Sequence, residues 1–414
     1  MGKNSTYEVD PGKAIDFSPK SLETFEYRPS PSCLEKVAYA EQGLARLDER
    51  LRFHEYSDIV SGYLMDLDAV ASGRISGERV SLRDLFFWHF FLTLSNANKE
   101  IPEFIEINRP DLSASYVEGY RKSLSFLKAH KGEMDLAFLL EVYEGLLPAS
   151  DKSGLRTSGV SFGESGQKGI DLYEPARPDE VALLLKNLLD FCTVSYSTPL
   201  VQTALAHFRF EAIYPFENGS DYMGRLLSHA VIMNRGLESH VVVPIGMYAA
   251  IHVAMHSNNL FPYKAKRQQS QHFVNRAVED FLNGCCVCAD YAVSISLKLI
   301  GEIQKITKRW DSMLGRVRPD SALKIVMHAI LAMPIFNADY LVAATGRSST
   351  AVNTAINQLI RSGVARQIST GKRNRLFEAP DIIALFDWIE TSMFPDDAPC
   401  RDDFSYQSVS FQNG

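Results

Sequence analysis

The sequence predicts a mainly helical protein with one small β-hairpin near its middle and a different kind of unit at its C-terminal end. Three observations carry this prediction. Apolar residues recur at three- and four-residue spacings along most of the chain. A Gly- and Ser-rich stretch at 152–176 replaces that period with short alternating pieces. After residue 317 the pattern changes to short helices followed by two short strands.

The helical period defines the first three quarters of the chain. It runs through residues 34–53, 76–98, 113–130, 135–147, 178–192, 198–213, 221–235, 245–257 and 268–312. Pro178 with two acids after it is typical of a helix start. With 414 residues the chain is long enough for two or three domains. We expect an N-terminal helical region at 1–110 and a core at 111–316.

The segment after the VRPDS linker (317–321) has the order helix, helix, turn, helix, hairpin. Its third helix is SSTAVNTAINQLIRSG, with Ser348 or Ser349 as the cap and Gly363 at the end. VARQISTGKRNRLFEA predicts two strands around a basic tip. This order is that of a winged helix-turn-helix, which we expect at 317–395, before a flexible tail at 396–414.

Basic residues gather in this C-terminal unit. Residues 320–380 hold seven Lys or Arg and three acids, a balance of about +4 in a chain of net charge −7. Arg347, Lys372, Arg373 and Arg375 are the candidates for contacts with DNA phosphates. The alternative is a protein-docking unit whose basic tip is only solvated.

The composition of the chain excludes some classes of function. The chain is 46% hydrophobic, 22% charged and acidic overall, so it is not a polycation that coats nucleic acid. No run approaches the roughly 18 apolar residues of a membrane span, so we expect no membrane partner. Cys285, Cys286 and Cys288 are expected to be buried thiols on a core helix, from which we expect a reducing, cytoplasmic location.

The stretch EAIYPFENGSDYMGRLL, residues 211–227, is the strongest functional candidate. It places a glycine-containing turn directly before a helix. The first amides of a helix have no intrahelical partners and its dipole is positive there, so such a turn can hold phosphates. Gly219 permits a positive φ, and Gly224 permits a close approach.

ALAHFRFEAIYPFENGSDYMGRLL (204–227) resembles the Fic core motif HxFxxIHPFxDGNGRxGRLL. The likeness extends to GLRTSGVSF (154–162), with Arg156 at the flap arginine, and to LYEPARPDEV (172–181). It covers most of residues 40–390 and implies a helical Fic/Fido fold with a hairpin flap. Fic enzymes transfer AMP from ATP, with Mg²⁺, to a protein hydroxyl, so the resemblance implies ATP, Mg²⁺ and a protein target. The chain is also compatible with a homodimer.

The chain departs from the motif where the chemistry resides. Tyr214 stands at the catalytic histidine and Asn218 at the metal-binding acid, while Ser220, Asp221 and Tyr222 replace Asn-Gly-Arg. Tyr214 is the catalytic candidate, and Asn218 the weak metal candidate, with Glu217 or Asp221 as substitutes. The nucleotide- or anion-binding candidates are Phe216, Gly219, Ser220, Asp221, Gly224 and Arg225.

Many Fic enzymes are inhibited by a Ser-x-x-x-Glu-Gly helix whose Glu pairs with the second arginine, here Arg225. The corresponding segment is expected at TLSNANKEI (93–101), with Asn98 at the Glu position.

The sequence leaves three hypotheses about function. The favoured one is a degenerate Fic protein with a binding or regulatory role. The others are an active nucleotidyl- or phosphotransferase with a rebuilt site, and a winged-helix DNA-binding regulator.

Overall fold

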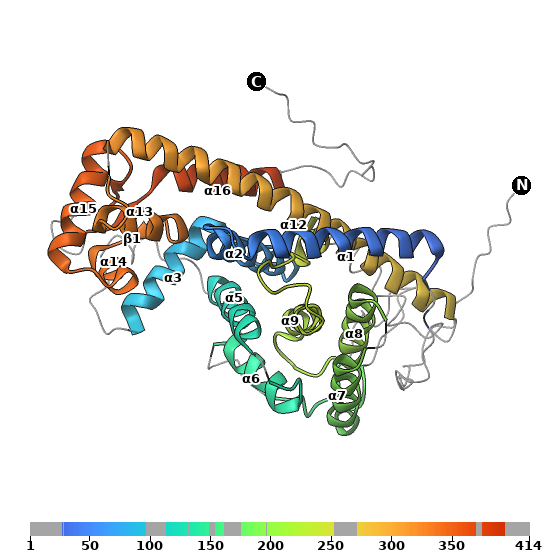
Figure 1. Ribbon diagram of the computed structural model, residues 1–414. Coiled ribbons are helices and arrows are strands. Elements are labelled where there is room, and N and C mark those ends of the chain that lie inside the picture. The colour runs from blue at the N-terminus through green and yellow to red at the C-terminus, as the bar shows by residue number, and fades with distance from the viewer. Residues whose placement is uncertain are drawn as a thin grey trace, which may run out of the picture.

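The computed structural model of the protein describes residues 27, 29–96, 113–130, 132–148, 154–160, 175–195, 197–251, 271–315, 317–369 and 375–393. These residues form a largely helical molecule with a small sheet in its C-terminal part (Figure 1). The N-terminal helices are α1 (Pro31–Leu51), α2 (Ser57–Ile75) and α3 (Leu82–Asn96). The central helices are α5 (Ser113–Ala129), α6 (Leu136–Leu146), α7 (Pro178–Thr193), α8 (Pro199–Ile213), α9 (Ser220–Asn234), α10 (Gly246–Ile251) and α12 (Gln271–Leu314). The mainly helical prediction is confirmed.

Helix α9 lies at the centre of the middle part of the molecule. It packs against α8 on one side and α5 on the other, and Figure 1 shows it between the α5–α6 and α7–α8 pairs. All but three of its residues are buried. The functional stretch 211–227 therefore begins at the end of α8 and continues into the core.

Helix α2 is a long element that the sequence pattern does not predict. Its buried residues lie on every side, so it has no polar stripe and almost no amphipathic period. It contacts α5, α10 and α3, with α12 and α13 beside it. The expected helix at 76–98 begins later, at Leu82, because Ser76 caps α2 and Gly77 turns the chain with φ +88°.

Helix α12 extends from the middle part of the molecule to the C-terminal part (Figure 1). Its segment Val278–Leu314 is long and apolar enough to cross a membrane by length and composition alone. However, 56% of its most apolar 18-residue window is buried inside the fold, as in a core helix. The prediction of buried thiols is confirmed, since Cys285, Cys286 and Cys288 are buried and none forms a disulfide.

The C-terminal part contains α13 (Ala322–Ala332), β1 (Ile335–Phe336), α14 (Ala338–Thr345), α15 (Ser349–Ser362), β2 (Arg366–Gln367), β3 (Phe377–Glu378) and α16 (Pro380–Met393). The strands pair antiparallel in the order β1-β3-β2. Every element expected here is present, and β1 and α16 are additions. Ser348 is the residue that caps α15, because its side chain accepts from Ala351 N.

Aromatic packing joins the C-terminal part to the N-terminal helices. Phe386 of α16 lies between the rings of Tyr63 and Phe86, with centroid distances of 4.5 and 4.8 Å. The buried Glu378 carboxylate pairs with Arg83 of α3 at 3.0 Å. Of the expected hairpin at 152–176, residues 152–153 and 161–174 lie outside the described part of the chain, as does the tail.

Candidate functional site

The loop between α8 and α9, residues 214–219, begins with a backbone conformation that is rare for a large side chain. Tyr214 ends α8 with φ 47° and ψ 67°, and its N–H donates to the Phe210 carbonyl at 2.9 Å. It is the only non-glycine residue with a positive φ in the part of the chain that the structure describes. Such a conformation persists only where the surroundings enforce it.

Arg156 holds the backbone of Tyr214 in this conformation. Its buried guanidinium donates to the carbonyls of Tyr214 at 2.6 Å, Ile213 at 3.2 Å and Ala176, and its backbone N–H donates to the Pro215 carbonyl at 2.9 Å. These bonds satisfy carbonyls that the end of α8 leaves without helical partners. The flap arginine thus fixes the start of the loop.

Packing fixes the rest of the loop. Phe216 is fully buried and stacks on Tyr143 at a centroid distance of 4.0 Å. Gly219 has φ +71°, and a Cβ there would lie 3.0 Å from Leu147. A Cβ on Gly224 would lie 2.3 Å from Glu211 Oε1. The two glycines therefore have the roles that the sequence predicts for them, a left-handed turn and a close approach.

The first turn of α9 holds the substituted positions. The Ser220 side chain is buried, and its hydroxyl has no hydrogen-bond partner among the described residues. Asp221 is exposed and brings a negative charge to this helix start. Tyr222 lies under Tyr116 and Tyr120, and burial raises its pKa to about 12. Only Arg225 remains as a cation of the motif.

Arg225 points to α2. Its guanidinium donates to Ser72 Oγ at 3.0 Å, the Ser72 carbonyl at 3.2 Å and Ser76 Oγ at 3.4 Å, and it lies 5.0 Å from the centre of the Tyr222 ring. The side chain is only 4% exposed. An incoming anion would have to compete with these serine contacts.

The contacts of Arg225 point to a second candidate for the inhibitory segment. The described partners lie at Ser72-Gly-Arg-Ile-Ser76-Gly77, which has the spacing Ser-x-x-x-Glu-Gly with Ser76 at the Glu position. The expectation at 93–101 stays a prediction, because residues 97–101 lie outside the described residues. At both places the chain lacks a glutamate at the Glu position of this pattern.

A buried ionic cluster lies one helical turn away from the contact between Arg225 and Ser72. Its only signal in the sequence is the pair of acids Asp66 and Asp68 within an apolar run. His229 of α9 bonds Asp68 of α2 through Nε2 and Glu238 through Nδ1, both at 2.9 Å. Tyr120 and the Gly246 amide also donate to Asp68, at 2.8 and 2.7 Å. Burial opposes the charged imidazole, but the two carboxylates outweigh it and raise the pKa of His229 to about 10.

Tyr214 is poorly suited to accept a proton. Burial raises the pKa of its phenol above the usual 10, and the carboxylates of Asp221 and Glu211 raise it further. The phenol is therefore neutral near pH 7 and acts as a donor. The imidazole that it replaces would be largely neutral there and able to accept.

The loop lacks the carboxylate that the motif places on Mg²⁺. At the acid position Asn218 offers an exposed amide, a weaker ligand than a carboxylate. The exposed Glu217 carboxylate, which accepts from Ser158 Oγ at 2.7 Å, and the exposed Asp221 of α9 stand at other positions of the motif. Within the described ranges, no group of three or more His, Cys, Asp or Glu side chains could hold a metal.

The comparison with known families agrees with this geometry. Residues 133–232, which include α6 to α9 and their loops, match the model of the Fic/DOC family. The chain contains a Fic/DOC domain. The Fic family protein from Desulfovibrio desulfuricans G20 has a similar fold, with a TM-score of 0.50, 18% sequence identity, and coverage of 85% of this chain and 97% of that one.

Two curated relatives of the Fic/DOC domain are protein adenylyltransferases by name. The chain is 25% identical to protein adenylyltransferase fic-1 of Caenorhabditis elegans over 142 residues, 33% of this chain. It is 28% identical to protein adenylyltransferase Fic of Drosophila willistoni over 149 residues, 35% of this chain. The match spans only 26% and 27% of those relatives, about a quarter of their length.

Two of the DNA-binding candidates lie in the described C-terminal part, outside the Fic/DOC loop. Arg347 precedes α15 and Arg375 precedes β3, while Lys372 and Arg373 lie outside the described residues. Two other cations of the C-terminal part are paired. Lys324 bonds Asp311 at 2.8 Å, and Arg366 bonds the buried Glu378. The winged-helix assignment and its DNA partner stay predictions.

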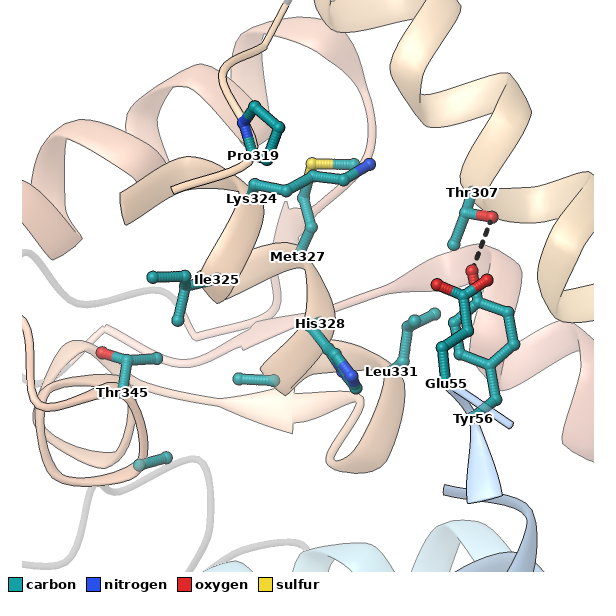
Figure 2. Close-up of a pocket in the computed structure, with 12 residues that line it drawn as sticks. Glu55, Tyr56, Thr307, Pro319, Lys324, Ile325, Met327, His328, Leu331 and Thr345 are labelled. Atoms are coloured by element: carbon teal, nitrogen blue, oxygen red, sulfur yellow. Dashed lines mark hydrogen bonds between the residues drawn. The ribbon is translucent and has the colours of Figure 1, made fainter. Parts of the chain in front are cut away.

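A cavity of about 410 Å³ lies in a third place, where α12, α13, α14 and the segment before α2 meet (Figure 2). Tyr56 and Thr307 face one another across one wall, with their hydroxyls 3.4 Å apart. Met327 and Leu331 form its apolar side. None of the Fic/DOC loop residues lines it.

Proposed function

We propose that this chain is a Fic-fold protein that does not transfer AMP from ATP to a protein hydroxyl and that instead acts as a binding or regulatory protein. The name adenylyltransferase belongs to relatives of which the chain spans about a quarter. The observation that carries the proposal is Tyr214, whose pKa burial raises, at the position of the proton acceptor.

The proton requirement makes this substitution decisive. Transfer to a hydroxyl needs a group that takes the hydroxyl proton as the new bond to phosphorus forms. A phenol of pKa 10 is ionised to only about 0.1% at pH 7, and a raised pKa lowers that fraction further. The loss exceeds about a thousandfold on the availability of the base alone.

The charges around the loop support the same conclusion. The first arginine of the motif is Tyr222, and Asp221 adds a carboxylate where phosphates would approach. The second arginine, Arg225, is engaged by Ser72 and Ser76. Ser76 stands where the inhibitory pattern has its glutamate. The lack of that glutamate fits a protein that has no transferase activity to inhibit.

Intact-mass spectrometry after incubation with ATP and Mg²⁺ tests the proposal. We expect no AMP adduct on the wild-type chain or on an added protein pool, and at most trace adduct with Tyr214→His alone. A variant with Tyr214→His, Asn218→Asp, Ser220→Asn, Asp221→Gly and Tyr222→Arg restores the motif and should form adduct. Robust adduct formation by the wild type would refute the proposal.

A transferase with a rebuilt site is the second candidate, because Gly219 turns the chain with φ +71° and the buried Ser220 hydroxyl beside it has no partner among the described residues. Calorimetric titration with ATP, with and without Mg²⁺, separates it from the first. Micromolar binding that Arg225→Ala abolishes and the exposed control Arg50→Ala preserves would favour the rebuilt site. Absence of heat at millimolar ATP would favour the binding protein.

A further inference from the structure

Helix α15 divides sharply into a buried side and a solvent side. The buried side, Val352, Ala355, Ile356 and Leu359, packs toward α13 and α14. The solvent side carries hydroxyls, amides and one guanidinium: Ser349, Thr350, Asn353, Thr354, Asn357, Gln358 and Arg361. A helix that merely faces water commonly mixes charges of both signs. This one presents no carboxylate.

The charge pattern around α15 is one-sided. From residue 340 to 377 the chain has six Lys or Arg and no Asp or Glu, although the whole chain has a net charge of −7. Arg347 stands before the helix and Arg361 in its last turn. Arg366 shares the buried Glu378 carboxylate with Arg83. The exposed Arg347 and Arg361 place positive charge at the two ends of α15.

The geometry leaves this side accessible. Figure 1 shows α15 at the outer edge of the molecule, away from the Fic/DOC domain. Side-chain hydrogen bonds along its solvent side stay within the helix, for example Asn353 Nδ2 to the Ser349 carbonyl at 2.9 Å and Arg361 Nε to the Asn357 carbonyl at 3.2 Å.

We propose that the solvent side of α15 binds in the major groove of duplex DNA, with Asn353 and Asn357 directed at base edges and Arg361 at the backbone. An α-helix fits the B-DNA major groove, where Asn pairs with adenine N6 and N7. The deep, narrow major groove of A-form RNA does not admit a helix, which favours DNA over RNA. The Ser348 cap stabilises the first turn of α15, so the helix is formed before any DNA binds. The proposal does not rest on the loss of AMP transfer.

Fluorescence anisotropy with a labelled mixed-sequence DNA duplex and the full chain tests the electrostatic part. Arg361→Glu and Arg50→Glu are matched, since each reverses an exposed arginine in the last turn of a helix, α15 and α1. Arg361→Glu should raise the Kd about tenfold or more and reduce the salt slope by about 1, whereas Arg50→Glu should change neither.

Selection of bound duplexes from a random pool tests base recognition. The wild type should enrich a site containing adenine, and the double variant Asn353→Ala with Asn357→Ala should lose that preference while it retains most non-specific affinity. No DNA binding at low salt, or equal losses in Arg361→Glu and Arg50→Glu, would overturn the proposal. Equal affinity for duplex RNA would overturn the choice of DNA.

Discussion

Tyr214 replaces the histidine of the motif in a loop whose backbone is tightly held. A bulky residue in the left-handed region costs about 1 to 3 kcal/mol, and Arg156 maintains that conformation through bonds to the Tyr214 and Ile213 carbonyls. Gly219, at the other end of the loop, also has a positive φ. Both ends of the loop are therefore ordered by contacts that do not involve the side chain of Tyr214.

Gly224 is the residue at which this retained packing is most sharply testable. Gly to Ala within a helix normally stabilises by up to about 1 kcal/mol. At Gly224, however, the new Cβ would lie 2.3 Å from Glu211 Oε1 and 3.3 Å from the Phe210 ring. Glu211 is buried and cannot swing into solvent. We expect Gly224→Ala to destabilise by about 1–3 kcal/mol, measured by urea unfolding.

Gly301→Ala is the matched control for that substitution. Gly301 also lies inside a helix, α12, but a Cβ added there would have no described atom within 4 Å. The same change should leave stability unaltered or raise it by up to about 1 kcal/mol. If both variants shifted the urea midpoint in the same direction, the close approach of α9 and Glu211 would be wrong.

At the scale of elements, α2 and α9 are joined by ionised groups in an apolar core. Asp68, His229 and Glu238 are completely buried in their side chains. The ion pairs compensate the cost of removing three charges from water only while all three remain together. The same two helices carry Ser72 and Arg225, so the cluster also fixes the distance between the serines and the arginine.

The raised pKa of His229, about 10, makes stability depend on pH. Its folded pKa exceeds the unfolded value near 6.5, so its contribution is complete below pH 6.5 and is lost as pH rises toward 10. The unfolding free energy should fall by up to about 1.4 kcal/mol per pH unit within that window. Urea unfolding at pH 6, 7, 8 and 9 measures this slope.

His229→Gln should flatten the slope and lower stability at pH 7 by about 3–5 kcal/mol, because two buried carboxylates lose their cation. His328→Gln, at an exposed position on α13, is the control and should retain the wild-type slope. A wild-type stability that rises between pH 7 and 9 would contradict the charged state assigned to His229.

The elements differ in how well the sequence predicts them, and burial explains the difference. Helix α15 has a clear apolar stripe, a serine cap and a terminal glycine, so the sequence predicts its range within one residue. Helix α2 is buried on all sides and has no stripe. The residues missed at the site, Ser72, Ser76 and Asp68, lie on α2 or cap it. Patterns in 211–227 identify the loop, but not the partner of Arg225, because that contact joins residues 149 and more positions apart.

At the scale of the whole molecule, the C-terminal part packs against the N-terminal helices and against α12. Besides the Phe386 contacts, Arg74 pairs with Glu390 at 3.0 Å and Trp310 Nε1 donates to Asp381 at 2.7 Å. Arg74 lies between Ser72 and Ser76, the two residues that hold Arg225. The Fic/DOC domain and the helix proposed to bind DNA therefore share one framework through α2.

This framework predicts a single cooperative unfolding transition. Phe386→Ala should lower stability by about 3–5 kcal/mol, since it removes a ring that is 1% exposed and contacts Tyr63 and Phe86. Trp388→Ala is the control on the same helix. That ring is 41% exposed and contacts Lys298 at 3.7 Å, so its loss should cost about 1 kcal/mol or less.

The measurement is urea unfolding followed both by far-UV circular dichroism, which reports all helices, and by fluorescence of the three tryptophans, which lie on α3, α12 and α16. Because α16 packs on α2 and α3, the two signals should coincide in the wild type and in Trp388→Ala. Phe386→Ala should move both midpoints together. If it instead separated the fluorescence transition from the circular dichroism transition, the C-terminal part would unfold independently, and α2 could not couple it to the Fic/DOC domain.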